Sequence, residues 1–308
     1  MHYTTQIDSI GLRVEFHSAE LQRARLNEMI NLVMSIETFF VDSKEHRFGN
    51  GGVRIEYVIY SNNTTIATIN TGVYAHGQDR KESTYYIKMV FAGLKSYDDY
   101  NDELRSNFLF AMASWLNSKR LPFKLSELDC NIDVNCAYDN FYAMQIKKVP
   151  NGRYHNEQIY ITTNYLQKKT KSVSALFYDK QFKESLHEQI SRFELKLPSK
   201  FFKNKNLDTL NEAISRIFER YAIFYFEDIR VKNQVLYIQK CIECSNIANK
   251  AREYNKLMSQ VNKYRLYPNF SYIMEYIYNL YSIKNYKMVV KKKEEEFVLN
   301  DSCGNFDF

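Results

Sequence analysis

Residues 172–197 read SVSALFYDKQFKESLHEQISRFELKL, and two short segments within them have alternating side chains. Ser174–Lys180 and Ile190–Leu197 are predicted to be β-strands, because successive side chains along a strand point to opposite faces of the sheet. The residues between the two segments are mostly polar, as expected for a connection. This stretch therefore predicts a pair of neighbouring strands around which the rest of the chain is organised.

The alternation places reactive side chains on one face of each predicted strand. Tyr178 and Lys180 share a face of the first strand, and Arg192, Glu194 and Lys196 share a face of the second. If the two strands are neighbours, a phenol, cations and a carboxylate meet on one sheet surface, which is the chemistry needed to transfer a phosphodiester to tyrosine. The alternative interpretation is an edge hairpin with a solvated polar face.

Composition indicates a globular protein that works in a reducing compartment. The 308 residues are 45% hydrophobic and 25% charged, which is ordinary for a globular chain long enough for one large or two smaller domains. No apolar run reaches the roughly 20 residues of a membrane helix, and the N-terminus lacks a signal-peptide pattern. The five cysteines have no disulfide-framework spacing, and a lone CxxC at Cys241 and Cys244 is weak support for zinc. We expect a cytoplasmic protein.

Positive charge is concentrated around the opening stretch. The formal net charge is +6, but residues 145–205 hold thirteen Lys and Arg against five Asp and Glu. A cation cluster of this kind binds phosphate backbones through counterion release, although many basic surfaces only confer solubility. The candidate nucleic-acid-binding residues are Lys168, Lys169, Lys171, Lys183 and Lys196.

The order of predicted elements favours an α+β fold. Strand-like segments and two amphipathic helical segments, Ala19–Phe40 and Asp98–Asn117, alternate up to about residue 200, which favours a mainly antiparallel sheet with packing helices. Asp42–Gly52 is predicted to be a break, and Ala137–Lys147 a hairpin partner of Lys124–Cys136. From residue 201 the pattern becomes helical. We therefore expect an α+β catalytic domain at 1–200 and a mainly helical DNA-binding or accessory region at 201–308 with a mobile tail, and no internal sequence repeat is evident.

A second informative stretch is Leu125–Asp133, which reads LSELDCNID. Acidic and amide side chains recur there at every second position, at Glu127, Asp129, Asn131 and Asp133, so they share one face of a predicted strand. An acidic row is costly to bury, so it faces water or holds cations. Asp129 and Asp133 are about 13 Å apart along an extended strand and cannot both ligate one ion directly. Pairing of Asp129 with Glu194 of a neighbouring strand would suit Mg²⁺ or Mn²⁺.

These segments together carry a resemblance to a known family. The succession of IDSIGLRVEF at 7–16, LSELDCNID at 125–133, IYITTNYLQKKTKSVSALFYDK at 159–180 and ISRFELKL at 190–197 resembles the replication initiation factor family of rolling-circle plasmids and filamentous phages. Members have a strand with two aspartates, then a strand ending in Tyr-x-Lys, then an Arg-x-Glu strand. They nick one DNA strand at the replication origin with a tyrosine and use a divalent ion.

The resemblance implies roles for particular residues. Tyr178 and Lys180 would fill the Tyr-x-Lys positions, Arg192 and Glu194 the Arg-x-Glu positions, and Asp129 and Asp133 the two aspartate positions. Tyr178, Lys180 and Arg192 are then the catalytic candidates, and Asp129, Glu194 and Asp133 the metal-ligand candidates. The chain departs from the family pattern at Glu127, where an arginine is usual, which puts the exact role of this strand in doubt.

Several alternatives remain open from the sequence. Tyr160 and Tyr165 compete with Tyr178 as nucleophile, and His155 and His187 are candidate bases, although an isolated histidine is usually just solvated. The six histidines contain no His-hydrophobic-His pair, which argues against the histidine-chelated nickases. The first hypothesis is a metal-assisted, tyrosine-dependent DNA nicking and joining enzyme that starts rolling-circle replication. The second is an origin-binding initiator or DNA-binding regulator without catalysis. Expected partners are origin DNA, single-stranded or supercoiled, and host helicase and polymerase, with a homodimer left open and no membrane.

Overall fold

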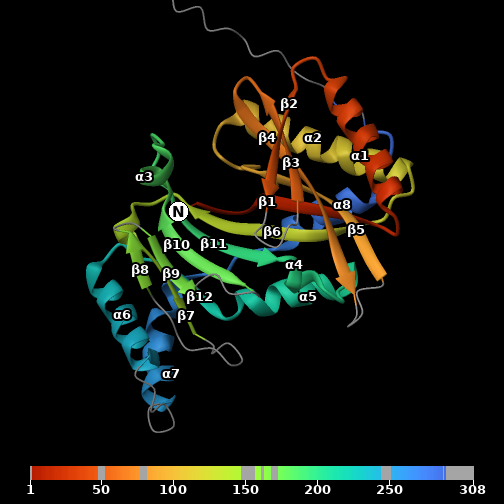
Figure 1. Cartoon of the computed structure of the whole chain (residues 1–308). Coiled ribbons are helices and arrows are strands. Elements are labelled where there is room, and N and C mark those ends of the chain that lie inside the picture. Colours follow the sequence, from red (N-terminus) through yellow and green to blue (C-terminus); the bar gives the residue numbers. More distant parts are fainter. Residues whose placement is uncertain are drawn as a thin grey trace, which may run out of the picture.

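The structure of the protein is a computed structural model in which a large antiparallel sheet is packed with helices (Figure 1). It describes residues 2–47, 53–76, 82–146, 157–160, 163–167, 173–243, 251–286 and 288. The expected α+β fold with a mainly antiparallel sheet is confirmed. Within these ranges, no helix has both the length and the apolar character needed to cross a membrane. The predicted mobile tail lies outside the described residues.

In the part of the chain that the structure describes, ten strands form one sheet, and all neighbouring strands in it are antiparallel. In order across the sheet they are β2 (Phe40–Arg47), β3 (Val53–Ser61), β4 (Thr64–His76), β5 (Glu82–Ala92), β1 (Tyr3–Phe16), β6 (Phe123–Val134), β11 (Ser191–Pro198), β10 (Ser174–Asp179), β9 (Thr163–Gln167) and β8 (Glu157–Tyr160).

The sheet consists of two five-stranded units with the same topology. In the first unit, the first strand β1 lies innermost, the last strand β5 lies beside it, and the order then runs back to β2 at the edge. In the second unit β6 lies innermost, β11 lies beside it, and the order runs back to β8. The innermost strands β1 and β6 pair antiparallel, so an approximate twofold axis passes between them. This repeat is visible in the strand order although the sequence shows none.

The apolar face of the sheet forms the core, and helices of the first unit cover part of it. Helices α1 (Ala19–Met34) and α2 (Asp99–Ser118) begin at capping side chains, because Ser18 accepts from the Leu21 N–H and Asp98 from the Asn101 N–H. Buried residues of α2 recur three or four positions apart, as in any helix that packs with one face. They meet strand residues such as Phe91, whose ring lies 5.7 Å from that of Phe108. Helix α1 ends at Met34, six residues before the end at Phe40 that the sequence pattern predicted.

Residues beyond 200 contribute to the same core. Helices α5 (Leu207–Phe218), α6 (Ile229–Glu243), α7 (Ala251–Val261) and α8 (Ser271–Ser282) confirm a helical C-terminal region, but strand β12 (Tyr221–Tyr225) interrupts it. The Phe218 ring of α5 lies 6.2 Å from Phe193 of β11 and 4.0 Å from Phe270. One buried apolar cluster therefore spans both sides of the boundary expected near residue 200.

Two local predictions are wrong. Strand β2 extends to Arg47, through much of the segment predicted as a break at Asp42–Gly52. Strand β7 (Phe141–Gln145) does not pair with β6 as a hairpin partner; it pairs with β12 in a second, three-stranded sheet with β13 (Arg265–Leu266). All five β7 residues are buried, and its partner lies about 80 residues later in the sequence, so no local turn signal indicates the pairing. In Figure 1 α6 and α7 lie at the β7 and β9 end of the molecule, away from α1.

A shared core predicts that the two parts of the chain unfold together. Replacing Phe218 with alanine removes a ring that contacts both Phe193 and Phe270, so we expect the free energy of unfolding to fall by about 3–5 kcal/mol. Denaturant unfolding should be followed by circular dichroism and by fluorescence of Trp115. Coincident, shifted curves are expected, whereas two separate transitions in the parent protein would contradict a shared core.

Candidate active site

The predicted reactive face is formed by three adjacent strands of the second unit, next to the first unit. Strand β11 lies between β6 and β10, and in the register Tyr178 is opposite Arg192, which is opposite Asp133. In the same way Glu194 is opposite Asn131 of β6. The edge-hairpin interpretation is therefore wrong, since Tyr178 is 1% exposed and Arg192 is fully buried. The phenol nevertheless lies on the same sheet face as the acidic residues.

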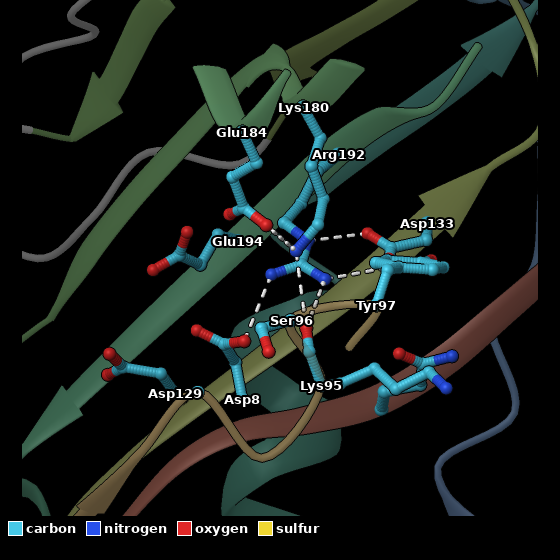
Figure 2. A network of polar contacts seen from close by, with 12 residues as sticks. Asp8, Lys95, Ser96, Tyr97, Asp129, Asp133, Lys180, Glu184, Arg192 and Glu194 are labelled. Carbon is cyan, nitrogen blue, oxygen red and sulfur yellow. Dashed lines mark hydrogen bonds and ion pairs between the residues drawn. The ribbon is translucent and has the colours of Figure 1, made fainter. Parts of the chain in front are cut away.

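The Arg192 guanidinium is the centre of this face (Figure 2). Its Nε and Nη2 atoms donate to the two carboxylate oxygens of Asp133 at 2.5 and 2.6 Å. Nη1 donates to Asp8 Oδ1 at 3.2 Å, and Nη2 also donates to the Lys95 carbonyl at 3.3 Å. The neighbouring carboxylate of Asp133 outweighs the effect of burial and raises the pKa of Arg192 well above its ordinary value. Arg192 is thus a permanently charged group held from three other segments, β6, β1 and the loop after β5.

Asp8 reaches Arg192 because of a β-bulge. The β1–β6 register steps from the pair Ile7–Cys130 to the pair Ser9–Asp129, so Asp8 is an extra residue without a partner in the ladder. A bulge of this kind re-aims a side chain, and here it adds a carboxylate from the first unit to the site of the second. Sequence reasoning missed Asp8. The signal that could have indicated it is the interrupted alternation at the consecutive polar residues Asp8 and Ser9.

A loop between β5 and α2 also enters the site. Tyr97 has a positive φ of 65°, and its hydroxyl donates to Asp133 Oδ2 at 2.6 Å. The Asp102 carboxylate holds the loop by accepting from the backbone N–H groups of Ser96 and Tyr97 at 2.9 to 3.0 Å. The loop therefore presents the Lys95 carbonyl to Arg192 in a fixed position. Nothing in the local sequence indicated that this loop would meet Asp133.

Tyr178 is hydrogen-bonded to a candidate base. Its hydroxyl donates to Glu194 Oε2 at 2.9 Å. Burial, followed by the negative charge of Glu194, raises the pKa of Tyr178 far above its usual value near 10, so the phenol is protonated at neutral pH. For Glu194 burial acts in the opposite direction, but Lys196 and Arg192 keep its pKa below the ordinary value. Glu194 is thus a carboxylate positioned to receive the phenolic proton.

A short helix, α3 (Lys180–Glu184), lies next to Tyr178. The helix begins directly after β10, where the Asp179 side chain accepts from the Phe182 N–H. Lys180 is fully buried, and its ammonium lies 3.0 Å from Glu184 Oε2 and 4.9 Å from the centre of the Tyr97 ring. Lys183 is exposed, and its ammonium lies 4.3 Å from the centre of the Tyr178 ring. The two lysines therefore lie against different rings, Lys180 against Tyr97 and Lys183 against Tyr178.

Two carboxylates of the site converge on one lysine. The Lys196 ammonium lies 2.6 Å from Glu194 Oε1 and 3.3 Å from Asp129 Oδ2. Burial and the nearby Glu194 carboxylate raise the pKa of Asp129 to about 7, although Lys196 opposes this shift. Asp133, in contrast, is engaged by Arg192 and Tyr97. In the part of the chain that the structure describes, no three His, Cys, Asp or Glu side chains form a group suited to a metal ion.

Some of the other residues that the sequence suggested for the site lie outside the described part of the chain. Lys168, Lys169, Lys171 and His155 lie outside the described residues, and the side chain of Tyr160 does as well. Tyr165 is opposite Leu176 of β10, two residues along the strand from the row that contains Tyr178. His187 is exposed. Among the three tyrosine candidates, Tyr178 is the one whose hydroxyl has a described hydrogen bond to a carboxylate.

Comparison with known proteins gives a distant likeness. No protein-family model matches the chain, and no curated protein matches it significantly. Among solved structures, the rolling circle replication initiator protein from Geobacillus stearothermophilus is similar with a TM-score of 0.37 and 13% sequence identity. The matched region covers 74% of this chain and 88% of that one. A similarity of this size assigns no activity to this chain.

Removing the Arg192 charge should destabilise the protein strongly. In Arg192→Met the Asp133 carboxylate is left buried without its cation, so we expect the free energy of unfolding to fall by about 3–5 kcal/mol. Arg230→Met is a matched control, because the 88% exposed Arg230 side chain forms a surface ion pair with Asp228. That pair is worth about 1 kcal/mol at most. Equal losses in the two variants, measured by denaturant unfolding, would contradict the described burial.

The raised pKa of Asp129 predicts a pH dependence of stability. The folded state binds the Asp129 proton more tightly than the unfolded state, whose aspartate pKa is near 4. Between about pH 4 and the folded pKa of about 7, the free energy of unfolding should therefore decrease as pH rises. Asp129→Asn removes this contribution, so its unfolding free energy should vary less over that range. The idea is excluded if the parent protein and the variant give parallel pH profiles.

Proposed function

We propose that this protein is a DNA nicking and joining enzyme that initiates rolling-circle replication with Tyr178 as its nucleophile. The observation that carries the proposal is the hydrogen bond from the Tyr178 hydroxyl to Glu194, next to a buried guanidinium on one sheet face. The motif resemblance found in the sequence supports the same residues. A buried tyrosine paired with a carboxylate amid cations fits phosphodiester transfer better than a passive sheet surface does.

The proposed reaction begins with the phenol. Glu194 accepts the Tyr178 proton while the phenolic oxygen attacks phosphorus, and the bond from phosphorus to the 3′ oxygen of the preceding nucleotide breaks. The leaving oxygen takes up a proton and becomes a free 3′-OH, and the new link is a 5′-phosphotyrosine. The reverse reaction joins the strand. A host polymerase would extend the 3′-OH, and a host helicase would unwind the duplex ahead of it.

The cations of the site would have different roles. Arg192 is bonded to Asp133, Asp8 and the Lys95 carbonyl, so we assign it to positioning of the strands and to the electrostatic potential around Tyr178. Lys183 is exposed beside the phenol ring and is suited to bind a non-bridging phosphate oxygen. Lys180 is buried against the Lys95 carbonyl at 3.2 Å and holds the start of α3 in place.

Access to the phenol requires a local movement. Because Tyr178 is 1% exposed, a phosphate can reach its hydroxyl only after neighbouring side chains move, and Lys183 of α3, whose ammonium lies over the Tyr178 ring, is one of these neighbours. Helix α3 has five residues and ends at Ser185 in the left-handed region, so the part of the helix beyond the buried Lys180 can move while Lys180 stays in place. We propose that binding of the origin strand displaces the part of α3 that carries Lys183 and exposes the nucleophile.

A divalent ion remains part of the proposal. Asp129 and Glu194 offer carboxylate oxygens on adjacent strands, which fits the ligand preference of Mg²⁺ or Mn²⁺. Lys196 lies between these carboxylates and would have to swing out, which its 42% exposed side chain allows. When bound, the ion would polarise a non-bridging phosphate oxygen. Asp133 is not assigned as a ligand, because Arg192 already engages its carboxylate.

An origin-binding initiator or regulator without catalysis is the second candidate function. It is favoured by the burial of the Tyr178 hydroxyl and its strongly raised pKa. Both functions place a cytoplasmic protein on origin DNA, and a homodimer is compatible with either. Only the first forms a covalent adduct.

The nicking reaction is tested with supercoiled plasmid that carries the protein's gene and upstream DNA. With Mg²⁺ or Mn²⁺, the parent protein should produce open-circle DNA with protein attached, and EDTA should suppress it. Tyr178→Phe keeps the ring but removes the nucleophile, so adduct formation should fall by at least about 1000-fold. Tyr165→Phe is the matched control and should retain activity. Full activity of Tyr178→Phe would reject Tyr178, and absence of any adduct in the parent protein would favour the second function.

A further inference from the structure

The first unit of the sheet carries a second polar cluster on the same face as the candidate active site. One row across the strands is formed by Gly72 of β4, Tyr86 of β5 and Glu15 of β1. The next row is formed by Asn70, Lys88 and Arg13. Neither Tyr178 nor the reaction proposed for it uses any of these residues. We name the cluster of Arg13, Arg54, Tyr74, Tyr86 and Lys88 the tyrosine–arginine surface.

Two stacked aromatic rings lie at the centre of this surface. The Tyr74 and Tyr86 rings have centroids 4.7 Å apart and planes inclined by 21°. Gly72 permits this arrangement, because a Cβ atom at that position would collide with the Tyr86 ring. Tyr74 remains 43% exposed. The Arg13 guanidinium lies 5.6 Å from the centre of the Tyr74 ring, and Arg13 Nη1 lies 3.4 Å from the Tyr74 hydroxyl oxygen.

Cations surround the rings, and their side chains reach solvent. Arg54 donates to the Asn70 amide oxygen at 2.8 Å through Nε, and its side chain is 41% exposed. Lys88 pairs with Glu127 of β6 and is 27% exposed. Each cation thus has an orienting polar partner, and each side chain remains partly exposed, that of Arg13 by 21%. Stacked rings interleaved with lysine and arginine are the combination that binds single-stranded nucleic acid.

The surface is continuous with the candidate active site. Glu127, the partner of Lys88, precedes Asp129 by two residues on β6 and therefore faces the same way. Glu127 lies opposite Gly11 and Asp129 lies opposite Ser9 in the β1–β6 register, so two small β1 residues separate the first-unit cluster from the acidic residues. A strand lying across the sheet can contact both clusters without leaving this face.

We propose that the tyrosine–arginine surface binds single-stranded DNA, with an unpaired base stacked on Tyr74 and flanking phosphates held by Arg13, Arg54 and Lys88. Stacking on an exposed ring requires a base that is not covered by neighbouring pairs, so duplex DNA cannot use the contact. That the bound strand is the one leading to Tyr178 rests on the proposed function. The binding itself does not.

The test measures equilibrium binding in the full chain carrying Tyr178→Phe, so that cleavage plays no part. A labelled oligo-dT of about 20 nucleotides, long enough to span several stacking sites, and a duplex of the same length are titrated by fluorescence anisotropy. Tyr74→Ala should weaken oligo-dT binding by about fivefold or more, while duplex binding stays the same. Tyr74→Phe, which keeps the ring, should bind like the parent. Tyr278→Ala is the matched control, because it removes a 42% exposed tyrosine of α8.

A second variant tests the phosphate contacts. Arg13→Gln should reduce the salt dependence of oligo-dT binding by about one phosphate equivalent. Circular dichroism melting of every variant reports whether it is folded. The proposal is overturned if folded Tyr74→Ala binds oligo-dT as tightly as the parent, or if Tyr74→Ala and Tyr278→Ala lose the same affinity. If plasmid nicking fails in the parent protein but Tyr74→Ala still weakens oligo-dT binding selectively, the proposed function fails and this surface stands.

Discussion

The pairing of Arg192 with Asp133 is the contact on which the rest of the site depends. A guanidinium without solvent exposure is costly unless its N–H groups are bonded and its charge is balanced, and here a two-pronged ion pair meets both needs. Asp8 and the Lys95 carbonyl complete its shell. Because Asp8 and Lys95 belong to the first unit of the sheet and Asp133 and Arg192 to the second, one buried charge joins the two units. The contact that fixes the reactive face therefore also links the two units of the sheet.

This pairing determines what the neighbouring groups can do. With Asp133 engaged by Arg192 and Tyr97, the carboxylate left beside the phenol is Glu194, which accepts the Tyr178 hydrogen bond and is kept ionised by Lys196. The acidic row of β6 is therefore divided in function. Its Asp133 end forms the buried ion pair with Arg192. Its Asp129 end lies near Glu194, and the Lys196 ammonium already occupies the space between these two carboxylates. The same row continues through Glu127 to the tyrosine–arginine surface, so a single sheet face combines both proposed DNA contacts.

Much of this face could be predicted because successive side chains along a strand point to opposite faces of the sheet. The period-two patterns of Glu127 to Asp133 and of Arg192 to Lys196 predict the shared faces from the sequence alone, and the two strands are indeed adjacent. Lys180 departs from the pattern, since Asp179 caps a helix there and turns the chain. The burial of Tyr178, the bulge at Asp8 and the contact of Tyr97 with Asp133 could not be predicted in this way. Each depends on segments that meet only in the folded chain, as does the pairing of β7 with β12.

The decisive measurement is the identity of the residue that carries DNA after reaction with origin DNA. The protein–DNA adduct would be digested with nuclease and trypsin, and the peptide retaining a nucleotide would be sequenced by mass spectrometry. Trypsin cleaves after Lys171 and Lys180 and releases SVSALFYDK, in which Tyr178 is the single tyrosine. The account predicts a 5′-nucleotide on that peptide. A nucleotide on any other tyrosine-containing peptide would contradict it.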